Sequence, residues 1–229
     1  MLNQEVQSLI KKLIPVNNQM IITKNMLGRD EFRSIIYRAN LGLLDSEIEE
    51  FGIFDVSSFL SALELLDDAT ITLDDNLINA TDGVNSLQFI TSSTESLDDI
   101  HVNESNITTT LAFDSILEFE MTSDIISKIK KASNVFKTFD TCYIVKKGDD
   151  VSIKLGIKDS FNSSVNTFNI RIDPKLSTSQ EYELAITLES ILKIPESDYN
   201  LMVKYKESAD AYRIVLENKL LTFVLSLKQ

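Results

Sequence analysis

Apolar residues near the start of the chain recur with the spacing of an amphipathic helix. They stand at positions i, i+3, i+4, i+7 and i+8, and with about 100° between successive residues they form one stripe, made of Val6, Leu9, Ile10, Leu13 and Ile14. Lys11 and Lys12 fall on the opposite side of this helix. The pattern therefore predicts a helix over residues 6–14 whose exposed face is basic.

A second helix of the same kind is expected 119 positions later, where residues 127–131 repeat the Ile-Lys-Lys step of residues 8–12. We expect its apolar stripe to be Ile125, Ile129, Ala132 and Phe136, with Ile126 and Ser133 at the edge. Lys130 and Lys131 would then be exposed, as Lys11 and Lys12 are. A lysine pair thus recurs on the polar side of two matching helices.

Alternation of apolar and polar residues predicts short strands between and after these helices. In the first half the expected strands are 20–22, 34–39, 48–54, 70–73, 77–80 and 86–90, with a turn at Gly28 and a helix after an N-cap at Asp55. In the second half they are 119–121, 142–145, 151–157, 167–172, 184–186, 201–205, 212–216 and 221–227. A hairpin turn is expected over residues 147–150, and Pro195 should end a short helix capped by Thr187.

The order of elements suggests an internal duplication. Residues 54–60 match residues 186–192 at an offset of 132, and each half runs helix, strands, helix, strands. Residues 91–110 are rich in Ser, Thr, Asp, Glu and Asn, which favours a linker. The sequence therefore predicts an α+β fold of two similar domains, 1–93 and 117–229, joined by a connector at 94–116. Each domain is expected to pack two helices on an antiparallel sheet.

The net charge of the chain bears on whether it can bind nucleic acid. The 229 residues include 35 Asp and Glu against 22 Lys and Arg, a formal charge of -13, which by itself disfavours nucleic acid as a partner. An uneven distribution would change that conclusion, because basic helix faces on an acidic protein confine attraction for DNA to one side. Lysines contact phosphates and do not read bases, so such a face would bind any duplex alike. For one helix alone, a solvated polar face is the simpler interpretation of the lysines.

Little in the sequence favours an enzyme. His101 is the one histidine, Cys142 is the one cysteine and lies in a predicted strand, and the six glycines form no phosphate-binding loop. Gly148-Asp149-Asp150 is best interpreted as a turn, and the acidic pairs lack His or Cys companions for a metal. We expect no catalytic residues, no metal and no cofactor. The N-terminus lacks the apolar core of a signal peptide, and no apolar run has the length of a membrane span, so we expect a soluble, reduced, intracellular protein.

Several segments resemble a known family, the DNA sliding clamps. The likeness is greatest to the trimeric polymerase processivity factors of T-even-type bacteriophages, and it extends diffusely along nearly the whole chain. It rests on residues 37–40 (Tyr-Arg-Ala-Asn), 53–69, 80–82 (Ala-Thr-Asp), 123–125 (Ser-Asp-Ile) and 194–201. The sequence differs from the family in a connector rich in Ser and Thr and in a chain that stops soon after the last strand.

The resemblance implies a non-enzymatic homotrimeric ring of six like domains, with helices lining the hole and sheets forming the wall. It implies double-stranded DNA, a DNA polymerase and an ATP-dependent clamp loader as partners, no membrane, and the cytoplasm of the infected host cell as location. The pore-lining lysines that would face DNA are Lys11, Lys12, Lys128, Lys130, Lys131 and Lys193.

Two further sites follow from the resemblance. Polymerase and loader tails would dock in an apolar cleft between the domains, for which the candidates are Leu41, Leu43, Ile107, Leu111, Phe113, Leu225 and Leu227. Ring closure would pair the strand at 86–90 with the strand at 167–172 of the next subunit, through Ser86, Leu87, Phe89, Phe168 and Ile170. The alternative is a phage structural or assembly protein of two β-rich domains with no role at DNA, in which the lysine pairs would be solvated surfaces.

Overall fold

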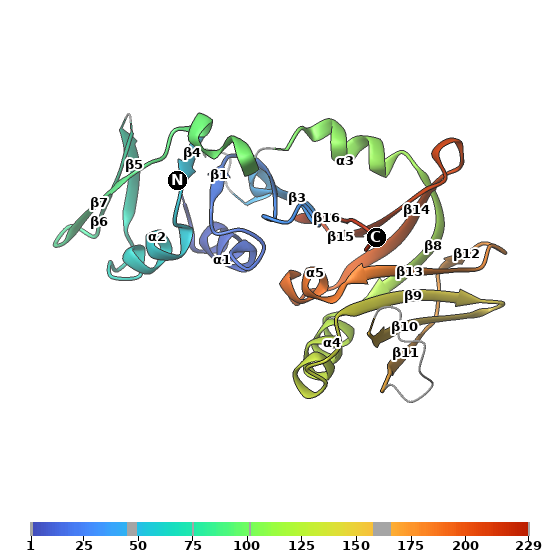
Figure 1. Ribbon diagram of the computed structural model, residues 1–229. Coiled ribbons are helices and arrows are strands. Elements are labelled where there is room, and N and C mark those ends of the chain that lie inside the picture. Colours follow the sequence, from blue (N-terminus) through green and yellow to red (C-terminus); the bar gives the residue numbers. More distant parts are fainter. Residues whose placement is uncertain (1, 45–49, 75, 101, 158–165, 229) are drawn as a thin grey trace. The chain divides into compact units, whose positions relative to one another are not determined.

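The computed structural model describes residues 2–44, 50–74, 76–100, 102–157 and 166–228 (Figure 1). The chain divides into two compact units. Unit 1 consists of Met1–Phe32 and Ile36–Glu104, and unit 2 of Arg33–Ile35 and Ser105–Gln229. The main division therefore falls inside the segment 94–116, and a short stretch of the first half belongs with the second unit.

Unit 1 contains the helices α1 (Gln4–Leu13) and α2 (Val56–Leu63), which lie side by side in Figure 1. Its strands are β1 (Met20–Ile22), β2 (Asn25–Arg29), β3 (Ile35–Asn40), β4 (Phe51–Ile53), β5 (Thr70–Asp74), β6 (Leu77–Thr81) and β7 (Ser86–Ile90). All pairings are antiparallel: β1 with β4, β2 with β3, and β5, β6 and β7 in that order. Short 3-10 helices cover Leu41–Leu43 and Thr94–Ile100.

Both helices of unit 1 begin where a side chain accepts hydrogen bonds from the first turn. The Asn3 Oδ1 atom accepts from the Val6 amide at 2.9 Å, and the Asp55 Oδ1 atom accepts from the Ser58 amide at 3.0 Å. The hydrogen bonds that Ser58 donates lower the pKa of Asp55. The N-cap expected at Asp55 is therefore confirmed, whereas α1 begins two residues before the predicted stretch. The predicted apolar stripes are buried at Val6, Leu9, Ile10 and Leu13 in α1, where Ile14 is half-buried, and at Val56, Phe59, Leu60 and Leu63 in α2. Each such side chain contributes about 1.5–3 kcal/mol by leaving water.

Unit 2 contains α4 (Ser123–Val135) and α5 (Leu188–Lys193), preceded by α3 (Glu104–Leu111) at the boundary between the units. Its strands are β8 (Asp114–Met121), β9 (Thr141–Lys147), β10 (Asp150–Gly156), β11 (Phe168–Ile172), β12 (Leu176–Ser177), β13 (Tyr182–Thr187), β14 (Tyr199–Lys206), β15 (Ala211–Glu217) and β16 (Leu221–Leu225). One antiparallel sheet has the order β11-β10-β9-β13, and a second runs β12-β8-β14-β15-β16. A third 3-10 helix covers Glu207–Ala209.

The helices of unit 2 repeat the arrangement of unit 1. Thr122 caps α4 by accepting a hydrogen bond from the Ile125 amide at 3.3 Å, and the Asp198 carboxylate accepts another from the Ser123 amide at 2.7 Å. Thr187 occupies the N-cap position of α5 but makes no capping bond with its side chain. The α+β fold class with two similar domains, each carrying paired helices and antiparallel strands, is confirmed.

One prediction concerning the first half is wrong. Gly28 was expected in a turn, yet it lies inside β2 opposite Tyr37 of β3. A Cβ atom on Gly28 would be 2.5 Å from the Tyr37 ring, so glycine is needed for the close approach of that buried side chain and not for a turn. Glycine has both uses, and the sequence alone did not distinguish them.

The predicted apolar stripe of α4 is correct at Ile129 and Ala132, but Ile126 is buried in place of Ile125 and Phe136. Ile126, Ile129 and Ala132 are buried, while Ile125 and Phe136 are half-buried. Because Ile125 and Ile126 are adjacent and identical, the sequence pattern alone could not decide which of them is buried. In the structure the buried one is Ile126. The lysines of α4 remain on the polar side of the helix.

The segment 91–110 is not an unstructured linker. It forms the 3-10 helix Thr94–Ile100 and most of α3, and its apolar residues Leu97, Ile100, Val102 and Ile107 are buried. Leu97 and Ile100 form a cluster with Ile21 of β1. The composition of the segment did not predict this structure, because four buried apolar residues suffice to anchor a segment that is otherwise polar. The expected contributions of Ile48 and His101 lie outside the described residues.

Candidate nucleic-acid interface

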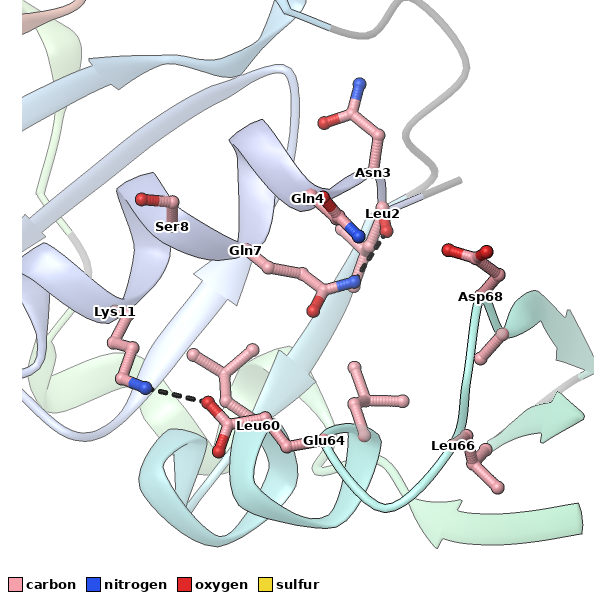
Figure 2. Close-up of a pocket in the computed structure, with 12 residues that line it drawn as sticks. Leu2, Asn3, Gln4, Gln7, Ser8, Lys11, Leu60, Glu64, Leu66 and Asp68 are labelled. Atoms are coloured by element: carbon pink, nitrogen blue, oxygen red, sulfur yellow. Dashed lines mark hydrogen bonds and ion pairs between the residues drawn. The ribbon is translucent and has the colours of Figure 1, made fainter. Parts of the chain in front are cut away.

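Lys11 and Lys12 occupy the last turn of α1, and both are exposed. The Lys11 ammonium lies 2.7 Å from the Glu64 carboxylate, which follows α2 in the same unit (Figure 2). Both side chains of this ion pair are exposed to solvent, at 62% and 61%. Among the described residues Lys12 has no ion-pair partner. The two neighbouring lysines therefore differ in how much of their charge is available.

Lys128, Lys130 and Lys131 extend along α4 in unit 2. The Lys130 ammonium lies 3.3 Å from the Glu196 carboxylate, and Lys128 pairs with Asp124 of its own helix at 2.6 Å. Within the described parts of the chain, Lys131 is exposed and has no ionic partner. This helix therefore has three lysines, of which two are ion-paired.

Lys193, in α5, pairs with Glu189 one helical turn earlier at 3.3 Å. The lysine side chain is only 18% exposed, so little of its charge faces solvent. Taken together, α1 and α4 carry five lysines against two acidic residues, whereas the whole chain has a net charge of -13. Positive charge is thus concentrated on the first helix of each unit.

A hollow of about 580 Å³ lies beside α1 and the end of α2 in unit 1 (Figure 2). The Lys11–Glu64 ion pair borders it, and the Gln7 side chain donates a hydrogen bond to the Leu2 carbonyl at 2.8 Å near its other end. Its lining mixes apolar and polar side chains: Leu2, Asn3, Gln4, Gln7, Ser8, Lys11, Leu60, Leu63, Glu64, Leu66, Asp68 and Ala69.

The residues predicted for the partner cleft differ in their exposure. Leu41, Ile107 and Leu225 are fully buried in the core. Leu43 is 53% exposed, while Leu111, Phe113 and Leu227 are half-buried. The Lys206 ammonium lies 5.4 Å from the centre of the Phe113 ring. Leu41 and Leu43 belong to unit 1 and the other five to unit 2, so the cleft itself stays a prediction.

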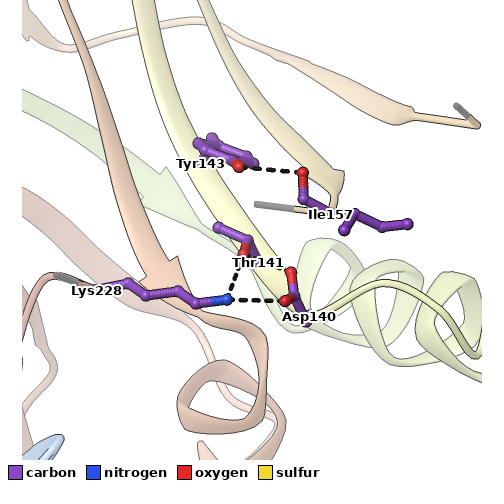
Figure 3. A network of polar contacts seen from close by, with 5 residues as sticks. All are labelled: Asp140, Thr141, Tyr143, Ile157 and Lys228. Atoms are coloured by element: carbon purple, nitrogen blue, oxygen red, sulfur yellow. Dashed lines mark hydrogen bonds and ion pairs between the residues drawn. The ribbon is translucent and has the colours of Figure 1, made fainter. Parts of the chain in front are cut away.

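The end of the chain is fixed to unit 2 on either side of Leu227. The Ser226 amide donates to the Ser34 carbonyl at 2.9 Å, and the Lys228 amide donates to the Ala185 carbonyl at 2.7 Å. The Lys228 ammonium also lies 3.0 Å from the Asp140 carboxylate and donates to the Thr141 hydroxyl at 2.8 Å (Figure 3). These contacts hold the last residues against β9 and β13, a role that no local pattern in the sequence predicts.

The strands predicted to close a ring both lie at the outside of their sheets. In the described part of the chain, β7 is the outer strand of the sheet β5-β6-β7, and β11 is the outer strand of β11-β10-β9-β13. Ser86 is exposed, whereas Leu87, Phe89, Phe168 and Ile170 are half-buried. Within the described residues each strand therefore has one edge without a neighbouring strand, which is the geometry that strand addition requires.

Groups that could suggest other chemistry have ordinary structural roles. Cys142 is buried in β9, and burial raises the pKa of its thiol to about 12. Lys147 lies opposite Asp150 in the register of the β9–β10 hairpin, with Gly148 at a φ of +55°. Among the described residues, no group of three or more His, Cys, Asp or Glu side chains is placed to hold a metal. None of the helices described is long and apolar enough to span a membrane.

Comparison with solved structures shows which known fold the chain has. Proliferating cellular nuclear antigen from Entamoeba histolytica superposes with a TM-score of 0.66, covering 97% of this chain and 94% of that one at 12% identity. Its counterpart from Thermococcus kodakaraensis superposes with a TM-score of 0.67, covering 98% and 96% at 13% identity. The fold is that of the DNA sliding clamps.

Sequence comparison adds a relative from a bacteriophage. No protein-family model matches the chain. The sliding clamp of Vibrio phage KVP40 is 28% identical over 203 residues, which cover 88% of this chain and 89% of the phage protein. With the clamp fold, this match along nearly the whole length supports a DNA sliding clamp of the phage type. The alternative of a phage structural protein finds no support in these comparisons.

The sequence prediction missed the acidic partners of the lysines. Glu64 and Glu196 are separated by 132 residues, the same offset that relates residues 54–60 to residues 186–192. This offset was the signal by which the two acidic residues could have been found. The offset alone does not show that the two glutamates form ion pairs; the structure shows this, because it places each one beside a lysine of the preceding helix.

Proposed function

We propose that three copies of this clamp close into a ring around duplex DNA and hold a DNA polymerase at its template. The observation that carries the proposal is the concentration of lysine on α1 and α4 in a chain of net charge -13. Lysines contact phosphates without reading the sequence, and each contact is weak and replaceable. A ring with such a lining would be retained by its closed shape while remaining free to slide.

In this proposal the pore-lining residues are Lys11, Lys12, Lys128, Lys130, Lys131 and Lys193. Acidic residues elsewhere would repel DNA from the outer surface, so that the duplex is attracted to the lysine-bearing helices alone. The function is mechanical and requires no catalytic step, metal or cofactor. It would take place in the cytoplasm of the infected host cell.

Ring closure would use β7 of one subunit and β11 of the next. Edge strands offer unpaired backbone amides and carbonyls, and a head-to-tail pairing of two different edges generates a closed ring if the rotation permits. Ser86, Leu87 and Phe89 on one side, with Phe168 and Ile170 on the other, would form the contact. The half-buried aromatic residues would then become fully buried.

Partner proteins would dock through short tails in an apolar cleft. Of the candidates, Leu43, Leu111, Phe113 and Leu227 keep exposed surface that a tail could cover, whereas Leu41, Ile107 and Leu225 would support the site from the core. We propose a DNA polymerase and a separate ATP-dependent clamp loader as these partners. The loader would supply the energy for opening the ring.

The proposal can be tested without a loader by allowing the protein to thread onto linear duplex DNA. Bulky end-blocking groups are added either before or after the protein, and retention is measured after a high-salt wash. A sliding ring should be retained only when the ends are blocked after mixing, and it should be released when the blocked DNA is cut. Equal retention under both orders of addition would show attachment to the side of the duplex and would contradict encirclement.

A further inference from the structure

Two adjacent lysines stand on α1 (Lys11 and Lys12) and two on α4 (Lys130 and Lys131). Within each pair the two lysines differ in the same way. Lys11 pairs with Glu64 at 2.7 Å, and Lys130 pairs with Glu196 at 3.3 Å. Among the described residues, neither Lys12 nor Lys131 has an ionic partner. The first lysine of each pair is therefore neutralised by a carboxylate, and the second is not.

This pattern follows the internal duplication of the chain. Lys11 and Lys130 are separated by 119 residues, as are Lys12 and Lys131, while Glu64 and Glu196 are separated by 132. Both acidic residues lie where the chain leaves the second helix of a unit: Glu64 is the C-cap of α2, and Glu196 follows Pro195 after α5. The same cross-helix ion pair thus occurs at equivalent positions of two units, which a chance encounter of surface charges does not explain.

A carboxylate this close to an ammonium changes how a phosphate is bound. The lysine must exchange the carboxylate for the phosphate, and the carboxylate then remains nearby and repels the phosphate. Such a lysine releases fewer counterions from DNA than an unpaired one, and it contributes less to the salt dependence of binding. Lys11 and Glu64 are exposed at 62% and 61%, and Lys130 and Glu196 at 28% and 48%, so solvent reaches both ion pairs. Such pairs are weak, and the exchange changes an affinity by only about 1.4- to 5-fold for each site.

We propose that Glu64 and Glu196 lower the affinity of the clamp for DNA by neutralising Lys11 and Lys130. Lys12 and Lys131 are then the principal phosphate contacts. This inference rests on the proposed encirclement of DNA. Weak binding favours sliding, because each phosphate contact must break as the ring advances. Glu64 and Glu196 act through the lysines and are positioning residues, not direct contacts to DNA.

The test compares three double variants in a salt series with a fluorescent linear duplex. Lys12→Ala with Lys131→Ala should reduce the slope of log affinity against log salt by about 0.9 for each lysine–phosphate pair that is removed. Lys11→Ala with Lys130→Ala, adjacent substitutions of the same type, should reduce it by less than half as much. Glu64→Gln with Glu196→Gln should raise the affinity about 1.4- to 5-fold for each site and make the slope steeper.

A matched control separates this effect from the loss of negative charge alone. Glu120 of β8 pairs with Lys175 at 3.8 Å, and both side chains are 58% exposed, close to the values for Lys11 and Glu64. Glu120→Gln therefore removes one charge and one exposed ion pair without touching the helices. It should change the affinity for DNA far less than Glu64→Gln.

The outcomes distinguish this inference from the proposed function. Equal slopes for the two lysine variants, with the Gln variants no different from the Glu120→Gln control, would overturn the moderating role and leave the DNA-facing assignment standing. If neither lysine variant alters the slope, the helices do not face DNA and both proposals fail. A lower thermal midpoint for the Gln variants with unchanged DNA binding would make the ion pairs structural links between helices, which also overturns the inference.

Discussion

The rotation of α4 about its axis can be tested by replacing two adjacent isoleucines. Ile126 is fully buried, whereas Ile125 is half-buried. Ile126→Ala removes three carbon atoms from the core, which costs about 2.4 kcal/mol at about 0.8 kcal/mol for each buried group. The cavity left behind raises the expected cost to about 3–4 kcal/mol. Ile125→Ala should cost about 1 kcal/mol or less.

The comparison is clean because both variants make the same chemical change in the same helix. The gain in helix propensity from Ile to Ala is shared by the two variants and cancels in the difference. Urea unfolding followed by circular dichroism, at one fixed protein concentration, gives the free energy of unfolding of each variant. Ile126→Val should lie between wild type and Ile126→Ala, since it removes one carbon atom.

An equal cost for the two alanine variants, or a larger cost for Ile125→Ala, would refute the assigned orientation. The helix would then be rotated towards Ile125, by part of the 100° that separates adjacent residues. Such a rotation would move Lys130 and Lys131 with it and would separate Lys130 from Glu196. The stability measurement therefore tests the geometry on which the DNA-facing assignment depends.

Three further substitutions and one thiol-labelling experiment have expected outcomes. Phe113→Ala should weaken binding of a polymerase tail peptide about ten-fold in fluorescence anisotropy, since aromatic residues with exposed surface are common anchors of docked peptides. Thr122→Ala should lower the free energy of unfolding by about 1 kcal/mol in urea, because α4 loses its cap. Gly28→Ala should cost about 1–3 kcal/mol in the same assay, because the added Cβ would overlap the Tyr37 ring. Cys142 should not react with a thiol reagent at pH 8 in the folded protein but should react readily in urea, because burial raises its pKa to about 12.

Each of these outcomes has a control. Phe32→Ala removes an aromatic side chain that is 68% exposed in unit 1 and should leave peptide binding unchanged; an equal loss for the two variants would reject the site. Thr122→Ser keeps the hydroxyl and should retain stability. A neutral effect of Gly28→Ala would show that the Tyr37 ring can move aside. For Cys142 the raised pKa means that its contribution to stability is complete below about pH 9 and is lost as the pH rises towards 12; rapid reaction of the native thiol would contradict its burial.

Much of the fold was predictable because local chemistry and packing agree. Asp55 has the side chain that an N-cap requires, the alternation in β5, β6 and β7 matches their burial, and the Lys147–Asp150 hairpin has its glycine at a positive φ. The duplication was visible because both halves preserve the order of elements. These features depend on residues that are close together in the sequence.

Features that depend on distant partners were not predictable. The role of Gly28 is set by the Tyr37 ring across a strand pair, and the structure of segment 94–100 is set by Leu97 and Ile100 packing with Ile21. The short strand β12 pairs two exposed residues with β8, so no alternation marked it. The ion pairs of Lys11 and Lys130 also depend on partners distant in the sequence, at the end of α2 and in the segment after α5. The lysines themselves could be predicted from the sequence, but their state of pairing could not.

The central claim is that three copies of the clamp form a ring, and the mass in solution tests it most directly. Light scattering over a dilution series should give about 77 kDa, three times the 25.8 kDa of one chain. A mass near 26 kDa that persists at micromolar concentration would contradict ring formation by the protein alone and remove the proposed basis for its retention on DNA.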